Sequence, residues 1–253
     1  NYAKMYAMHA AGDLGDIIAF DPSHYHFVRA IEKNIIMPLT ELVNADQLDL
    51  SQCFEKFITI QYYKGDIYGL PSWGWTGHDT LIVNKKIFDA EGIELPEPTS
   101  HETSMDTIAE WIRKLYKKDE RYGCNLNVGE SGQVVLCRAF NSDFINEDGT
   151  KCLLLEDPNA EEAYKWLYQL AVEDKVLPMP GELSGGLVSL TEAGRLAMAW
   201  SGSLGVRNFK RDIQDPEKAE AYQVLFPTRE DGTFPCQIRG GTWNLLKGTE
   251  YPQ

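Results

Sequence analysis

Tryptophans beside glycines are the residues of this sequence best suited to holding a ligand. Trp73 and Trp75 flank Gly74, and this composition predicts a loop between two short strands. One interpretation is a wall that faces a ligand, and the other is packing between adjacent elements. A second stretch, Arg239 to Trp243, combines a guanidinium, two glycines that let a ligand approach the backbone, and another indole. Trp243 could equally lie in the core.

The elements around these residues follow the pattern of an α/β protein. Residues 2–11 have helical spacing, 16–20 form a short apolar strand, and Asp21-Pro22 predicts the start of the next helix. Short strands are expected at 67–70, 80–83 and 224–227. Further helices are expected at the residues listed here: 51–62, 85–91, 104–118, 129–141 and 157–170.

Composition excludes several classes of partner. The chain has 253 residues, 43% of them hydrophobic, and a formal net charge of −14, which argues against binding nucleic acid or an anionic membrane. No run of 18 apolar residues is present. The five cysteines lack C-x-x-C spacing, so they indicate neither a zinc site nor a disulfide framework, although a single bridge is possible.

Motifs for catalysis and for metal binding are weak. His24 and His26 stand two positions apart in an expected helix, where side chains do not face each other. Residues 144–155 do not supply the carboxylates of a calcium loop. No nucleophile elbow, phosphate loop or dinucleotide fingerprint occurs. We therefore expect no metal, no cofactor and no catalytic residue, although 38 acidic residues leave a glycoside hydrolase with paired carboxylates as an alternative.

Three stretches together resemble a known family. They are Y-x-G-x-x-Y-G-L-P followed by L-I-V-N-K-K-I-F in residues 63–88, L-T-E-A-G-R-L-A-M-A-W-S-G in 190–202, and I-R-G-G-T-W-N-L-L in 238–246. They are similar to bacterial extracellular solute-binding proteins, the family that contains the maltodextrin- and other sugar-binding components of ABC importers. The resemblance extends over nearly the whole chain. It implies an α/β, two-lobed periplasmic-binding-protein fold with a ligand cleft between the lobes.

The resemblance also implies limits for the lobes and a set of ligand-binding residues. Lobe 1 would comprise residues 1–78 and 225–253, lobe 2 would comprise 79–224, and both ends of the protein would be missing. The predicted ligand-binding residues are Asp21, Ser23, His24, Trp73, Trp75, Asp79, Trp200, Ser201, Gly202, Arg239, Gly240, Gly241 and Trp243. Many sugar binders of the family have a tryptophan where this chain has Leu204, so the stacking platform is either lost or moved to another tryptophan.

The function implied is capture of a mono- or oligosaccharide, without catalysis, for import by the membrane permease of an ABC transporter. We expect a monomer that binds no nucleic acid and lies outside the cytoplasmic membrane, either free in the periplasm or lipid-anchored. The alternative within the same fold is an anionic ligand, a glycerophosphodiester or a sugar acid, held by Arg239, Arg207 and the helix start near Gly202.

Overall fold

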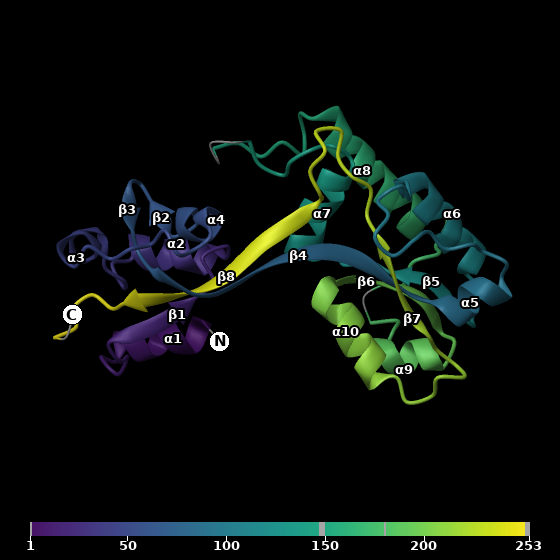
Figure 1. Ribbon diagram of the computed structural model, residues 1–253, viewed down its shortest axis with the longest axis horizontal. Coiled ribbons are helices and arrows are strands. Elements are labelled where there is room, and N and C mark those ends of the chain that lie inside the picture. The colour runs from purple at the N-terminus through teal and green to yellow at the C-terminus, as the bar shows by residue number, and fades with distance from the viewer. Residues whose placement is uncertain (1, 147–149, 180, 251–253) are drawn as a thin grey trace. The chain divides into compact units, whose positions relative to one another are not determined.

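The chain folds into two compact units. The computed structural model describes residues 2–146, 150–179 and 181–250, and side chains within these ranges except at 75–78, 130–131, 203–204 and 237–238. Unit 1 comprises Asn1–Thr76 and Ile238–Gln253, and unit 2 comprises Gly77–Gln237 (Figure 1). Both mix helices with strands, so the α/β class expected from the sequence is confirmed.

Unit 1 is built on a sheet of β1, β8 and the first half of β4. Its elements are α1 (Tyr2–Ala10), β1 (Ile17–Phe20), α2 (Tyr25–Glu32), α3 (Thr40–Ala45), α4 (Glu55–Thr59), β2 (Tyr62–Tyr63), β3 (Asp66–Ile67), β4 (Leu70–Asn84) and β8 (Cys236–Leu245). Strand β1 is antiparallel to β8, with Ile17 opposite Leu245, and β4 lies on the other side of β8. The helical repeat of α2 turns Phe27, Ala30 and Ile31 into the core of this unit.

Helix α2 begins later than the sequence predicts. The expected cap was Asp21, but the cap is His24, whose Nδ1 accepts a hydrogen bond from the backbone N–H of His26 at 3.4 Å. Asp21 instead forms a turn, in which its Oδ1 accepts from the backbone N–H of Ser23 at 3.0 Å. A carboxylate that bonds to the backbone two residues ahead stabilises such a turn, so Asp21 remains outside the helix.

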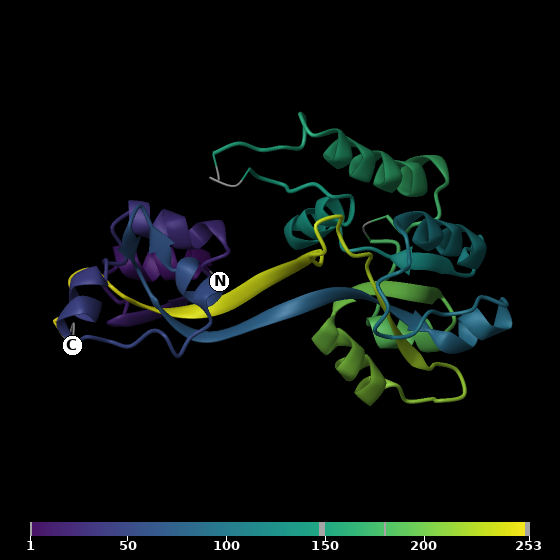
Figure 2. The same ribbon diagram turned by 45° about the horizontal axis from the view of Figure 1, so that its top comes forward.

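Strand β4 replaces the loop that was expected around the tryptophans. It runs for 15 residues without interruption and contains both Trp73 and Trp75; its ribbon can be followed in Figure 2. Gly74 is required for packing and not for a turn, because a Cβ there would overlap the ring of Phe57. The prediction of two short strands was therefore wrong. Gly74 was taken to indicate a loop, but it is explained by the close packing of Phe57.

Unit 2 contains a four-stranded sheet in the order β7, β4, β6, β5. Strands β7 and β6 are antiparallel to β4, and β5 is parallel to β6. Its remaining elements are α5 (Lys85–Ala90), α6 (Met105–Leu115), β5 (Tyr122–Asn125), α7 (Glu130–Ala139), α8 (Pro158–Tyr168), the π-helical turn η1 (Gln169–Glu173), α9 (Leu187–Glu192), β6 (Leu196–Gly202), α10 (Ser203–Asp212) and β7 (Ala221–Leu225).

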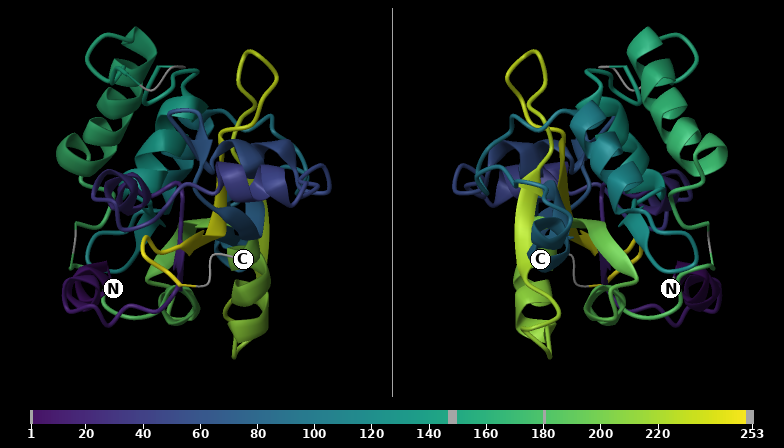
Figure 3. Two further views of the ribbon diagram at one scale, coloured as in Figure 1. Left: turned by 90° about the vertical axis from the view of Figure 1, so that its left-hand side faces the viewer. Right: turned by 90° about the vertical axis from the view of Figure 1, so that its right-hand side faces the viewer.

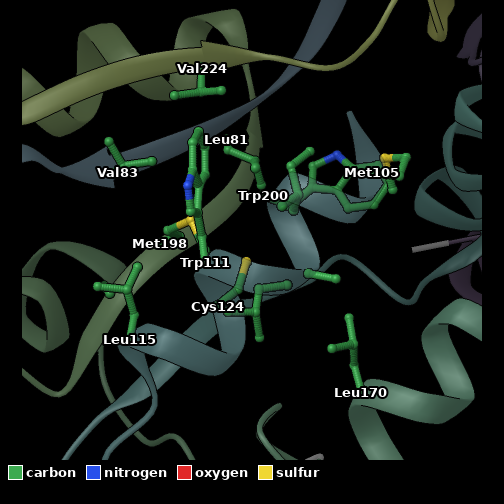
Figure 4. Close-up of a cluster of buried hydrophobic side chains, with 14 of the residues drawn as sticks. Leu81, Val83, Met105, Trp111, Leu115, Cys124, Leu170, Met198, Trp200 and Val224 are labelled. Carbon is green, nitrogen blue, oxygen red and sulfur yellow. The ribbon is translucent and has the colours of Figure 1, made fainter. Parts of the chain in front are cut away.

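Helices cover both faces of the sheet in unit 2. Figures 1 and 3 show α6 and α8 on one side of these strands and α10 on the other. The first side holds the larger core, in which Leu81 and Trp200 pack with Trp111 of α6 (Figure 4). On the other side, Ile82 packs against Val206 and Phe209 of α10. Neighbouring residues of one strand therefore point to opposite faces.

The segment that follows β7 packs with unit 2. Phe226 is buried in its larger core, Arg229 forms an ion pair with Asp143 at 3.2 Å, and Nη1 of Arg138 donates to the carbonyl of Cys236 at 2.7 Å. Residues 225–237 thus belong to this unit, whereas the sequence prediction returned the chain to the first lobe at 225. The predicted lobe limits 1–78, 79–224 and 225–253 remain predictions.

Candidate functional site

Four predicted site residues of unit 1 lie on or next to one strand, β8. Side chains alternate along a strand, so positions 239, 241 and 243 share one face and position 240 points to the other. Arg239 and Trp243 therefore face the same way, with Gly241 between them. This face is where the structure brings the candidate residues of unit 1 together.

Asp21 and Arg239 form an ion pair across this face. Nη2 of Arg239 donates to Oδ2 of Asp21 at 3.0 Å, although the residues are 218 positions apart. The other carboxylate oxygen accepts from the backbone N–H of Ser23 at 3.0 Å, and the Ser23 hydroxyl contacts that same oxygen. Ser23 therefore orients Asp21, which in turn orients the more exposed guanidinium.

Trp73 packs closely against the backbone of Gly241. A Cβ on Gly241 would overlap Nε1 of the indole, and a Cβ on Gly240 would come within 2.9 Å of the Trp73 carbonyl oxygen. The two glycines are thus needed to seat Trp73, and the indole remains 56% exposed. Gly241, which the indole contacts, and Arg239 are one strand repeat apart along β8, about 7 Å between their Cα atoms.

Trp243 is also half exposed, but its surroundings are apolar. It lines a cavity of about 290 Å³ with Ile17, Leu42, Val43 and other aliphatic side chains. The alternative, a place in the core, is not observed, since the indole is 54% exposed; its predicted role in ligand binding stays a prediction. None of the described side chains that line this cavity is a guanidinium, so none can donate two parallel hydrogen bonds to a ligand as Arg239 can.

His24 is engaged in local structure. Besides capping α2, its ring lies 5.3 Å from that of Tyr2 and stacks on that of His26 at 5.0 Å. Nδ1 of His26 lies 3.2 Å from the hydroxyl of Tyr6. Burial, followed by His24 and Arg29, lowers the pKa of His26, so its neutral form is favoured.

In unit 2, Asp79 and Trp200 form a hydrogen-bonded pair. Nε1 of Trp200 donates to Oδ1 of Asp79 at 3.1 Å. The indole is only 6% exposed and packs on Phe226 with 4.6 Å between ring centroids. The ring is thus packed in the core, and its N–H orients the carboxylate of Asp79. The place of Trp200 among the ligand-binding residues stays a prediction.

Ser201 and Gly202 lie where β6 passes into α10. Gly202 is the N-cap of α10 and makes no side-chain cap hydrogen bond. Ser201 points to the face opposite Trp200, where its Oγ lies against Gly205 in the first turn of the helix. The Ser201 side chain therefore supports α10, and the backbone at Gly202 is the part available to a ligand.

Two further observations complete the site. The side chain of Trp75 lies outside the described part of the structure. Phe57 was not predicted, yet its ring contacts the positions that a Cβ would occupy on Gly74 and Gly240; the glycine spacing was its only signal in the sequence. Among the described residues, no group of three or more His, Cys, Asp or Glu side chains is arranged to hold a metal ion.

Comparison with known proteins identifies the family. The family model described as bacterial extracellular solute-binding protein matches residues 1–253. The chain belongs to this family. This family is one of solute-binding proteins. No curated protein sequence is similar enough to count as a relative. None of the described helices is long and apolar enough to cross a bilayer.

Solved structures of solute-binding proteins share the fold at low sequence identity. The ABC substrate-binding protein Lmo0181 of Listeria monocytogenes, in complex with cycloalternan, matches with a TM-score of 0.78 and 21% identity over 98% of this chain and 61% of its own. A protein of Thermotoga lettingae bound to α-D-tagatose gives 0.73 and 19% over 99% and 63%. UgpB of Mycobacterium tuberculosis, with glycerophosphocholine, gives 0.74 and 14% over 98% and 59%. The chain thus spans about three fifths of the length of these proteins and has their periplasmic-binding-protein fold.

Proposed function

We propose that this solute-binding protein captures a carbohydrate and releases it unchanged to the membrane permease of an ABC importer. The observation that carries the proposal is the packing of the exposed Trp73 indole against Gly241. Gly241 lies two residues along β8 from Arg239, which forms the ion pair with Asp21. An indole face covers the C–H side of a sugar ring, while a guanidinium and a carboxylate bond to its hydroxyls.

The similar structures support a sugar as ligand. Two of the three described above are bound to carbohydrates, cycloalternan and α-D-tagatose. In unit 2, the carboxylate of Asp79 offers a hydroxyl acceptor whose position is set by Trp200. In each unit a carboxylate is therefore held in place by a neighbouring residue, Asp79 by Trp200 and Asp21 by Ser23. Groups that are already ordered lower the entropic cost of binding.

The family supports a proposal about the partners and the location. We propose a monomer that acts outside the cytoplasmic membrane, where the permease of an importer collects its ligand, either free or anchored by a lipid. The net charge of −14 supports a protein that does not bind nucleic acid.

A phosphodiester is the second candidate ligand. The likeness to UgpB with glycerophosphocholine favours it, and Arg239 is a suitable bidentate donor for phosphate oxygens. In this version the guanidinium, and not the indole of Trp73, would supply most of the affinity.

A ligand screen by melting temperature and tryptophan fluorescence tests the proposal. The full-length protein that contains residues 1–253 would be mixed with neutral sugars, sugar acids and glycerophosphodiesters. A ligand that binds the folded state raises the melting temperature, and contact with the exposed Trp73 shifts its emission. A saturable response to a sugar that is lost in Trp73→Ala supports the proposal. Binding of phosphodiesters alone would favour the second candidate.

A further inference from the structure

The connection between α7 and α8 brings two cysteines of unit 2 into one neighbourhood. Cys137 is buried in the last turn of α7. Cys152 is exposed and pairs with Ile145 in an isolated antiparallel bridge, beyond the turn that ends α7. Both thiols are free in the structure. The connection therefore carries one buried and one exposed thiol on segments that fold back toward each other.

A series of hydrogen bonds links the backbone of Cys137 to the residue next to Cys152. The N–H of Ser142 donates to the carbonyl of Cys137 at 3.0 Å. The hydroxyl of Ser142 donates to Oδ2 of Asp157 at 2.6 Å, and the N–H of Asp157 donates to the carbonyl of Leu153 at 2.9 Å. Because Ser142 is buried, its hydrogen bonds are strengthened by the low dielectric around them. Residues 151–157 are thus held against the end of α7.

Tyr164 of α8 lies beside both thiols. Its hydroxyl donates to Oε1 of Gln133 at 2.9 Å, and Gln133 stands one helical turn before Cys137 on the same face of α7. Burial raises the pKa of Tyr164, and Cys137 and Cys152 raise it further, an electrostatic effect that weakens with distance. The phenol is therefore a common neighbour of the two cysteines.

The two thiols differ in their access to an oxidant. Burial raises the pKa of the Cys137 thiol to about 11, with smaller contributions from Asp157 and Cys152. The thiolate is the form that attacks a disulfide, so Cys137 is protected from direct oxidation and the exposed Cys152 reacts first. The side chain of Cys152 can then turn toward α7, as the geometry of a disulfide between the two residues requires.

We propose that Cys137 and Cys152 form a disulfide when the protein meets a disulfide-containing oxidant, and that this bond fastens residues 151–157 to α7. The thiolate of Cys152 attacks one sulfur of the oxidant and releases the oxidant's other sulfur as a thiolate. Cys137 then loses its proton to water, attacks the sulfur of Cys152 and releases the second oxidant thiolate. Two electrons pass from the cysteines to the oxidant. The inference goes beyond the proposed function and does not depend on the ligand.

Peptide mapping tests the bond. The full-length protein that contains residues 1–253 would be incubated with oxidised glutathione or with dithiothreitol, alkylated and cleaved with trypsin. Cleavage after arginine and lysine releases residues 122–138, which contain Cys137, and residues 152–165, which contain Cys152. We expect these two peptides to be linked only in the oxidised sample. Because residues 122–138 also contain Cys124, fragmentation of the linked peptides identifies the bonded cysteine.

The melting temperature measures how firmly the bond fastens residues 151–157. A bond that closes a loop of this length should raise the melting temperature of the oxidised protein by roughly 5–10 °C over that of the reduced protein. Cys152→Ser changes an exposed side chain, so the fold should be kept, whereas the linked peptides and the temperature difference should both disappear. Cys53→Ser is the matched control, because Cys53 lies in unit 1. It should keep the linked peptides and the difference.

Three results would count against the proposal. Alkylation of both Cys137 and Cys152 in the oxidised wild type would overturn it, because no bond would have formed. A bond from Cys152 to a different cysteine would overturn the pairing. Equal melting temperatures of the bonded and the reduced wild type would overturn the fastening of residues 151–157 to α7.

Discussion

Trp73 and Gly241 fit together so closely that any side chain at position 241 would displace the indole. A Cβ there would overlap Nε1 of Trp73, and the indole is exposed enough to swing away. The pair connects β4 to β8 and holds an exposed indole against Gly241, two residues along β8 from Arg239 and its ion pair with Asp21. The first prediction follows from this contact.

Gly241→Ala should weaken ligand binding more than it weakens folding. We expect the affinity for a sugar to fall by about tenfold or more because the aromatic face moves, since stacking on an aromatic ring contributes roughly 1–3 kcal/mol in related recognition. Titration calorimetry measures the affinity, and a melting curve measures the fold. The control is Gly15→Ala, because a Cβ on Gly15 meets no atom within 4 Å. Unchanged affinity in Gly241→Ala would separate Trp73 from the ligand.

Trp200→Phe should reduce binding through Asp79. The variant keeps a buried ring but removes the indole N–H that donates to Asp79 at 3.1 Å; loss of a hydrogen bond to a charged group costs about 1.5–3 kcal/mol. We expect a lower melting temperature and a lower affinity. Trp111→Phe is matched to it, because Trp111 is 9% exposed in the same core (Figure 4). If both variants lose stability equally and neither loses affinity, Trp200 has no positioning role.

The histidine cluster of unit 1 should make stability fall in mild acid. The pKa of His26 lies below its usual 6.5 in the folded chain, first because of burial and then because of His24 and Arg29. Protons therefore bind more tightly to the unfolded state, so the free energy of unfolding decreases as the pH falls below about 6.5. Melting temperatures measured between about pH 7.5 and pH 5 should show this slope. His26→Gln should flatten it.

The control for this slope is His9→Gln. His9 is exposed at the end of α1, so its removal should leave the pH dependence as it is in the wild type. A slope that persists in His26→Gln and disappears in His9→Gln would contradict the assignment to the cluster.

Glu91 should stabilise unit 2 above the acid range. Hydrogen bonds from Lys117 and Arg121, at 2.7 and 2.8 Å, lower the pKa of Glu91 to about 2 from its usual 4.5. The stabilisation is therefore complete above about pH 4.5 and is lost as the pH falls toward 2. Glu91→Gln should melt at a lower temperature at neutral pH and lose less stability on acidification. Glu110→Gln, exposed on α6, should behave like the wild type.

Local signals in the sequence predicted most helices correctly. Ser104 caps α6 by accepting from the backbone N–H of Thr107 at 3.1 Å, and Asp157 caps α8 by accepting from that of Asn159 at 2.9 Å. In both cases the capping residue and its partner are close in sequence, so their chemistry can be read directly. The α/β class followed from the order of several such elements, and the family from the resemblance carried by residues 63–88, 190–202 and 238–246.

Errors arose where distant residues decide the structure. Strand β4 is continuous through Gly74 because it pairs with a neighbouring strand, and no local pattern in the sequence reveals this pairing. The absence of a side chain at Gly74 leaves room for the ring of Phe57. Asp21 was read as a cap, but its partner is Arg239, 218 positions away. Trp200 was predicted to bind a ligand, which stays a prediction; the structure places its ring in the core of unit 2, and no local pattern in the sequence shows this.

Titration calorimetry of the full-length protein with neutral sugars, followed by mass spectrometry of the recovered sugar, tests the central claim most directly. We predict saturable heat with one site per chain, loss of that heat in Trp73→Ala, and a sugar of unchanged mass. A sugar that returns with an altered mass, or the absence of heat with every carbohydrate tried, would contradict the account.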